Sequence, residues 1–316
     1  MLVVAIVATV ATYLSFRQQV WLRQVQNTTD RATVESVRQG ALAFAGVVLD
    51  EDLKQNNFDH LKEKWAQPVI LPFDGGTVAI AITDAQARFN LNSLQVGGSA
   101  PPQSGQPPAN PSNPEMVGQI TQAFAQLLVA LKIDPGLANA LKDWIDPDTN
   151  TLPGGAEDLE YATLSVPYRA ANQLLISVDE LRLIKGFTKE IVETLRPFVI
   201  ALPGPAPINA NTASETVLAT LFSGGGDTAA KDIVRARDAK PFESITDYDK
   251  ALPQGVQKWS NLTPSTASSY FLVNVDIRVG RLSSQTEGLI KREGNRKTTV
   301  YWSRPRPIVI QNEEPS

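Results

Sequence analysis

The feature that most restricts this chain is a stretch of about sixty helix-compatible residues at its start. Met1–Phe16 carry no charge, and a charged, periodic sequence follows with no proline before Pro68. Only Gly40 and Gly46 interrupt the pattern. Because a helix rises about 1.5 Å per residue, such a segment extends well beyond one globular core. We expect residues 1–66 to form one helix with its first third in lipid and the rest in water.

The apolar run is short for a membrane span, because a hydrocarbon core of about 30 Å requires roughly 20 apolar residues. A cleaved signal peptide is an alternative, but no basic residue precedes the run and no small-x-small cleavage site follows it. Arg17 and Arg23 instead continue the helical pattern. We therefore expect a retained transmembrane helix, with a leader and a few apolar residues preceding Met1. A buried core helix is the third alternative.

The composition limits the chemistry available to the chain. Its 316 residues leave room for two domains, and a net charge of −4 argues against a general nucleic-acid binder. It has no cysteine and one histidine, His60, so disulfides, zinc thiolate sites and the usual catalytic triads cannot be assembled. We expect a protein that is not an enzyme.

Strand patterns appear before and after a long central region. Gln67–Asp74 is interpreted as a proline-bounded turn, Thr77–Asp84 alternates as a half-buried strand does, and Phe89–Leu94 adds a short strand or turn. Later strands are predicted at Tyr270–Arg278, Ser283–Lys291 and Thr298–Ser303. We expect residues 67–95 and 266–316 to form one antiparallel sheet that an insertion divides.

The insertion has helical periodicity. Residues 96–114 are dominated by Gly, Pro, Ser, Gln and Asn, which predicts a flexible linker. Apolar residues then recur at helical spacing along Met116–Leu131, and Leu137–Ile145 predicts a second helix. Capping-box spacing indicates further helix starts at Ser177–Glu180 and Thr212–Glu215. We expect residues 115–265 to form an inserted all-α domain.

An oxygen-rich segment beginning at Asp146 is the strongest chemical signal. Counting from that residue, positions 1, 3, 5 and 12 carry side-chain oxygens and position 7 offers a backbone carbonyl. Calcium loops use this spacing to collect about six to eight oxygen ligands. Asp143 and Asp158 add nearby carboxylates. The predicted calcium ligands are Asp146, Asp148, Asn150, Leu152, Glu157 and Asp158.

This segment departs from an EF-hand. Thr151 stands where the loop requires glycine, and no strongly amphipathic helix follows Glu157. We expect a structural calcium loop of similar ligand logic. An ordinary acidic turn is the alternative, because Asp-Pro-Asp-Thr-Asn is also common turn sequence.

Two segments, Glu180–Val199 and Asn209–Arg237, look like helix–hairpin–helix units. In DNA-binding versions, backbone N–H groups at the hairpin bind a phosphate. Here Asp227 directly follows the second hairpin and would repel a phosphate, and acidic residues outnumber basic ones in residues 115–201. We expect a compact helical domain that binds no nucleic acid. A membrane-tethered DNA-uptake protein is the alternative function.

Several phrases together resemble the K-type minor pseudopilins of the bacterial type II secretion system. They are Asp84–Leu94 (DAQARFNLNSL), Asp143–Tyr161 (DWIDPDTNTLPGGAEDLEY), Tyr168–Asn172, Glu180–Leu183 and Ile208–Ala213. The resemblance implies an α+β, pilin-like fold with a long N-terminal hydrophobic helix and an antiparallel β-sheet. It also implies a large all-α domain of helix-hairpin-helix or SAM-like type inserted between strands, with calcium in that domain. The glutamate usual near the start of major pilins has no counterpart among Met1–Phe16.

The resemblance implies a structural subunit at the tip of a pseudopilus, which initiates its assembly for protein export across the outer membrane. Its implied partners are the I- and J-type minor pseudopilins in a cap complex, other pseudopilins and the inner-membrane assembly platform. It leaves open whether the tip contacts a secreted substrate. The implied location is the bacterial inner membrane, crossed once, with a periplasmic C-terminal domain. A periplasmic hydrolase would require a nucleophile–base pair, which we do not find.

The N-terminal helix also provides candidate interface residues. Past the apolar run, four residues follow at near-helical spacing: Val20, Trp21, Val25 and Thr28. We expect them to pack against partner helices. Burial on the chain's own sheet is the alternative for later residues such as Val37, Leu42 and Phe44.

Overall fold

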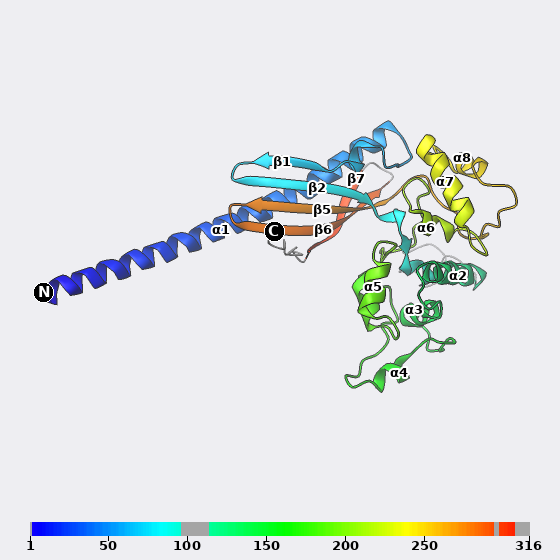
Figure 1. Cartoon of the computed structure of the whole chain (residues 1–316), viewed down its shortest axis with the longest axis horizontal. Coiled ribbons are helices and arrows are strands. Elements are labelled where there is room, and N and C mark those ends of the chain that lie inside the picture. Colours follow the sequence, from blue (N-terminus) through cyan, green and yellow to red (C-terminus); the bar gives the residue numbers. More distant parts are fainter. Residues whose placement is uncertain (1, 96–113, 294–296, 307–316) are drawn as a thin grey trace, which may run out of the picture. The chain divides into compact units, whose positions relative to one another are not determined.

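The computed structural model describes residues 2–95, 114–293 and 297–306 (Figure 1). The chain divides into two compact units. The spine–sheet unit comprises the residues up to Asp52, Lys64–Thr83 and the residues from Leu272 onward, and the helical unit comprises Leu53–Glu63 and Asp84–Phe271. Apart from Pro114, the predicted linker 96–114 lies outside the described residues.

Helix α1 extends over Leu2–Gln55. Its described side chains from Leu2 to Thr29 are all exposed, and burial begins in its second half, at Ala41, Leu42, Ala45 and Leu49. This spacing places the buried residues on one face of the helix. The prediction of a helix to residue 66 was wrong at its end. Asn56 terminates α1, because its Oδ1 accepts a hydrogen bond from Phe58 N at 3.1 Å and so offers the backbone a local alternative to the helix.

The main sheet has the strand order β1-β2-β5-β6-β7. The strands are β1 (Val69–Phe73), β2 (Gly76–Asp84), β5 (Tyr270–Val279), β6 (Leu282–Glu293) and β7 (Lys297–Pro305). Strands β1 and β2 pair antiparallel, as do β6 and β7. Strand β2 lies beside β5, which confirms the prediction that strands before and after the insertion share one sheet.

Strand β1 lies within Gln67–Asp74, so the predicted turn over these residues was wrong. Its register runs from Val69 opposite Ile80 to Phe73 opposite Gly76. Pro72 is tolerated because β1 is the edge strand of the described sheet, where a missing N–H removes no ladder bond.

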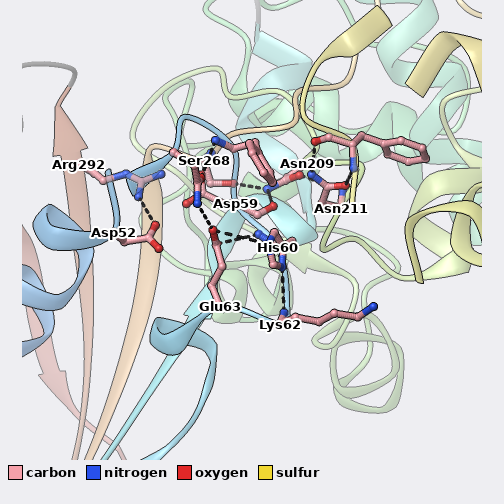
Figure 2. A network of polar contacts seen from close by, with 12 residues as sticks. Asp52, Asp59, His60, Lys62, Glu63, Asn209, Asn211, Ser268 and Arg292 are labelled. Carbon is pink, nitrogen blue, oxygen red and sulfur yellow. Dashed lines mark hydrogen bonds and ion pairs between the residues drawn. The ribbon is translucent and has the colours of Figure 1, made fainter. Parts of the chain in front are cut away.

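Within the spine–sheet unit, the second half of α1 packs against the sheet. A Cβ atom on Gly46 would lie 2.7 Å from Thr298 Oγ1 in β7, so the close approach of helix and strand depends on this glycine. Arg292 of β6 forms an ion pair with Asp52 of α1 at 3.2 Å (Figure 2). Both side chains are almost fully buried, so breaking this pair by removing one member would be more costly than breaking an exposed pair.

The helical unit is built around one buried cluster that includes Phe124, Leu141, Trp144, Leu181 and Leu218. A helix begins at the predicted segment Thr212–Glu215, but its N-cap is Ser214 rather than Thr212; Ser214 Oγ accepts a hydrogen bond from Val217 N at 3.3 Å. Ser177 caps a 3-10 helix rather than an α-helix. The α-helices are α2 (Pro114–Ala130), α3 (Leu137–Ile145), α4 (Asp158–Ala162), α5 (Lys189–Leu195), α6 (Glu215–Ala219), α7 (Asp227–Ala239) and α8 (Ile245–Lys250).

The insertion is not purely helical, which corrects the prediction. Strand β3 (Phe89–Asn90) pairs in parallel with β4 (Val199–Ile200) inside the helical unit and does not join the main sheet. The Asn90 side chain holds this pair together: Oδ1 accepts from Leu202 N at 3.0 Å and Nδ2 donates to Gly204 O at 2.8 Å. Such amide bonds are not visible in hydrophobic periodicity.

Candidate functional site

The predicted calcium loop joins α3 to α4. Asp143 lies in the last turn of α3, Asp146 is the C-cap residue of that helix, and Glu157 is the N-cap residue of α4. Asp146, Asp148 and Glu157 each offer a carboxylate oxygen, and these three oxygens lie within 4.8 Å of one another. The fold therefore brings three of the predicted ligands together.

Several carboxylate oxygens of this loop are removed from water and from protein donors, although Asp148 is exposed. Glu157 is 5% exposed and Asp143 is fully buried. Both oxygens of Glu157, and Oδ1 of both Asp143 and Asp146, are buried and accept no hydrogen bond from any described residue. A buried charge without a partner is costly, and oxygens of this type are the ligands that a hard cation prefers. The residues present fit a calcium ion.

The acidity of these groups reflects their crowding. Burial is the largest cause, and repulsion from Asp148 and Asp143 adds to it; together they raise the pKa of Asp146 to about 6. Burial and the neighbouring carboxylates raise the pKa of Glu157 to about 7. Burial also raises the pKa of Asp143. Since a metal ligand must be deprotonated, we expect cation affinity at this loop to increase with pH.

The remaining predicted ligands have additional partners. Asp148 Oδ1 accepts hydrogen bonds from N and Nδ2 of the exposed Asn150, at 2.8 and 2.9 Å. The Leu152 carbonyl accepts one from Gly155 N at 2.9 Å and keeps a second lone pair. Asp158 Oδ1 accepts one from Ala170 N at 3.0 Å, and its other oxygen lies 4.0 Å from Arg169 Nε. Asp158 is not part of the cluster that Asp146, Asp148 and Glu157 form.

Asp143 has a larger role than the sequence spacing suggested. Its Oδ2 accepts a hydrogen bond from Leu152 N at 3.0 Å and so fixes the middle of the loop to α3. Asp143 and Asp146 are three residues apart, a helical spacing that places both on one side of the C-terminus of α3. That spacing was the available signal, but burial of Asp143 depends on the tertiary packing.

The predicted interface residues lie on the exposed first half of α1. Val20, Trp21 and Val25 are 38%, 60% and 45% exposed. Thr28 is also exposed, and its hydroxyl donates to Gln24 O at 2.9 Å. Among the later residues, Leu42 is buried and Phe44 is 40% exposed. In the part of the chain that the structure describes, no helix combines the length and apolarity needed to cross a membrane.

Comparisons with known proteins identify the family. Models described as "Type II secretion system (T2SS), protein K" match residues 87–204 and 208–267. Type II secretion system protein K of Pseudomonas aeruginosa is 36% identical, with 89% of this chain and 83% of that protein covered. The chain belongs to the type II secretion system protein K family. The Aeromonas hydrophila member is 29% identical, with 95% of this chain and 93% of that protein covered.

A solved structure extends the similarity within the protein K family to the fold. It is the GspK-GspI-GspJ complex of the type 2 secretion system of enterotoxigenic Escherichia coli. The matched chain has a TM-score of 0.73 and 26% identity, with 90% of this chain and 99% of that chain covered. The predicted family and the predicted pilin-like α+β fold are therefore confirmed.

In this member of the protein K family, the second predicted helix–hairpin–helix segment presents an acidic residue directly after its hairpin. Helix α7 begins at Asp227, directly after Gly224–Gly226. Lys231 on this helix lies 3.8 Å from Glu215 Oε1, so its charge is partly neutralised. The comparisons give no support to the alternative of a DNA-uptake protein.

Two sequence phrases behind the predicted family meet in a buried polar network of the helical unit. Asp84 Oδ2 accepts hydrogen bonds from Asn209 Nδ2 at 2.9 Å, Thr212 Oγ1 at 2.5 Å and Ser268 Oγ at 2.7 Å. Ser268 N donates to Asp59 Oδ2 at 2.6 Å (Figure 2). These bonds connect segments far apart in sequence, which no local pattern could predict.

Proposed function

We propose that this chain is the tip subunit of a type II secretion pseudopilus. It forms a cap complex with the I- and J-type minor pseudopilins and initiates assembly of the pseudopilus for export across the outer membrane. The observation that carries the proposal is the extensive similarity to GspK, whose solved structure is a complex with GspI and GspJ. The role is structural, and no catalytic step is assigned to it.

The first half of α1 supplies the proposed contact with partner helices. Val20, Trp21 and Val25 expose aliphatic and aromatic surface to solvent. Burial of apolar surface contributes about 25 cal/mol per Å², so packing of this stretch against similar helices is favourable. Thr28, one helical turn beyond Val25, marks the end of the proposed contact.

The apolar run Met1–Phe16 supplies the proposed anchor in the inner membrane. Its described side chains are exposed and none is charged. In this arrangement the sheet and the helical unit are periplasmic, and the run moves from lipid into the filament core on assembly. Other pseudopilins and the inner-membrane assembly platform are then further partners. The proposal leaves contact with a secreted substrate to experiment.

The size of the insertion favours a terminal position. Most of the helical unit is inserted in the sequence between β2 and β5, so the chain carries a whole domain in addition to the pilin-like sheet. A subunit with so large an addition cannot readily be covered by a further subunit, which suits the end of a filament.

We also propose that the loop between α3 and α4 holds a structural calcium ion. Asp146, Asp148 and Glu157 supply the converging carboxylates. Asp143 lies outside this group of three, and its buried Oδ1, which accepts no hydrogen bond from the described residues, is a candidate for a further ligand. Asn150, Leu152 and Asp158 complete the predicted ligand set. When bound, the ion offsets the mutual repulsion of these carboxylates and stabilises the connection between the two helices.

Assembly with partners is the decisive test of this function. The full chain in detergent should be mixed with its I- and J-type counterparts and examined by size-exclusion chromatography with light scattering, with calcium and with chelator. We expect a stable 1:1:1 complex when calcium is present. Failure to form a complex in both conditions would contradict the cap assignment.

A further inference from the structure

An aromatic cluster joins the two arms of the calcium loop. Trp144 follows Asp143 directly, and Tyr161 lies four residues after Glu157. Their rings meet edge to face with centroids 5.1 Å apart, and Tyr168 stacks on Tyr161 at 5.2 Å. Trp144 and Tyr161 are 3% and 2% exposed. Aromatic pairs of this kind are close-packed, so separating the arms must break the stack.

The same rings form hydrogen bonds to residues 180–187, at the start of the predicted helix–hairpin–helix segment Glu180–Val199. Trp144 Nε1 donates to Glu180 Oε1 at 3.1 Å, and the Tyr168 hydroxyl donates to Leu183 O at 2.7 Å. The Tyr161 hydroxyl accepts from Lys185 N at 3.4 Å. Hydrogen bonds therefore connect residues 180–187 to the aromatic cluster, although none of these residues is a predicted ligand.

We propose that occupancy of the calcium loop controls the docking of residues 180–187 onto the aromatic cluster. This inference rests on the proposed calcium site and adds a specific consequence of its occupancy. Without a cation, the carboxylates of Asp146 and Glu157, which offer oxygens within 4.8 Å of each other, repel one another across the loop. These two residues belong to the two arms that carry Trp144 and Tyr161. Repulsion that separates the arms opens the stack and releases the hydrogen bonds to residues 180–187.

Hydrogen–deuterium exchange on the full chain tests this coupling, with calcium binding measured separately by titration calorimetry. When a ligand is present at about 100 times its Kd, the population of conformations that cannot bind it falls by up to about 100-fold. We expect chelation to accelerate exchange in residues 143–158 and in residues 180–187 by up to this factor. Residues 227–250, in α7 and α8, serve as the internal reference and should not change.

Each outcome has a definite meaning. Calcium binding with faster exchange in both segments on chelation supports the coupling. Calcium binding with changes confined to residues 143–158 overturns the coupling and leaves the calcium proposal intact. If no calcium binds, both proposals are overturned.

A conservative pair of variants tests the route. Tyr161→Phe keeps the ring and removes the hydroxyl that accepts from Lys185 N. Tyr248→Phe is the matched control, because Tyr248 is equally buried and packs edge to face on Phe242 elsewhere in the helical unit. We expect both variants to bind calcium. The calcium-dependent change at residues 183–187 should shrink in Tyr161→Phe alone; an undiminished change there would contradict a route through Tyr161.

Discussion

Gly155 occupies a place in the calcium loop where a side chain has no room. A Cβ atom there would overlap Asp143 Oδ2 and lie 3.1 Å from Leu152 O. Asp143 is fully buried and cannot move aside. We expect Gly155→Ala to lower the free energy of unfolding by about 1–3 kcal/mol, the usual cost of overpacking, and to weaken calcium binding. Denaturant unfolding and titration calorimetry measure the two effects.

Gly118→Ala in α2 is the control for this substitution. A Cβ atom at Gly118 meets nothing within 4 Å, and alanine is favoured over glycine in a helix interior by up to about 1 kcal/mol. This variant should be unchanged or more stable, with unaltered calcium binding. Equal destabilisation by both variants would show that the contact with Asp143 is not the cause.

Asp84 should make the stability of the chain depend on pH. Burial outweighs the hydrogen bonds from Thr212 and Ser268 and raises the pKa of Asp84 from 3.8 to about 6. The folded state therefore binds this proton more tightly than the unfolded chain does. The resulting contribution is fully present below about pH 4 and is lost as pH rises through 6. We therefore expect the contribution of Asp84 to lower the urea midpoint of unfolding as the pH rises from 4 to 7.

Asp84→Asn should remove that part of the pH dependence, while Asp134→Asn, at an exposed position, should leave it in place. Urea titrations at several pH values compare the three proteins. A slope that persists unchanged in Asp84→Asn would assign the dependence to other groups.

Only part of the candidate calcium site could be predicted from the sequence. Spacing alone placed Asp146, Asp148 and Glu157 in one loop, because ligand position within a loop is a local property. The inward position of Asp143 and the use of Asp158 by Ala170 N are tertiary facts. The bond to Asp158 depends on how the segment around Ala170 returns to α4, which local spacing does not encode.

Among the single elements, α1 has exposed residues that should matter for binding to partners but contribute little to the stability of the chain. Trp21 is 60% exposed on a helix segment that the described residues do not cover. We expect Trp21→Ala to change the free energy of unfolding by less than about 0.5 kcal/mol. Loss of an interface aromatic commonly costs about 2 kcal/mol or more, so affinity for the I- and J-type partners should fall more than tenfold.

Binding measurements on purified partners, combined with thermal unfolding, distinguish these two effects. Ile176→Ala is the control, because Ile176 is 78% exposed in the helical unit, away from α1 in sequence. Equal loss of partner affinity in both variants would contradict a specific contact at Trp21.

Elements with a regular pattern were predictable, and those defined by side-chain bonds were not. From Val273 onward, strand β5 alternates so that Val273, Val275 and Ile277 are buried, and the sequence shows this directly. Strand β1 was concealed by Pro72, which is compatible with a strand only at an edge. The end of α1 at Gln55 depends on the hydrogen bond between Asn56 and Phe58, in a stretch with good helix-forming composition.

For the molecule as a whole, the division into two compact units predicts that the units unfold in separate transitions. Each unit has its own buried residues, such as Leu49 in the spine–sheet unit and Leu141 in the helical unit. Proteins with two domains commonly unfold in more than one transition. We expect scanning calorimetry to resolve two transitions and excess chelator to lower the temperature of one of them.

The calcium-sensitive transition should belong to the helical unit. Glu157→Gln should lower its midpoint in calcium and reduce its response to chelator, while the other transition stays in place. A chelator effect of equal size on both transitions, or on neither, would contradict this assignment.

The insertion of the helical unit between β2 and β5 also has a consequence for synthesis. Strand β2 is complete long before its neighbour β5 exists, because roughly 185 residues separate them, and at about 5–20 residues per second this takes roughly 10–40 s. Throughout that time β2 has an open edge on the side that β5 will occupy, and such edges recruit other chains. The nascent chain is therefore most vulnerable to aggregation during this interval, and a chaperone that covers β2 until β5 emerges would increase the yield of folded subunit.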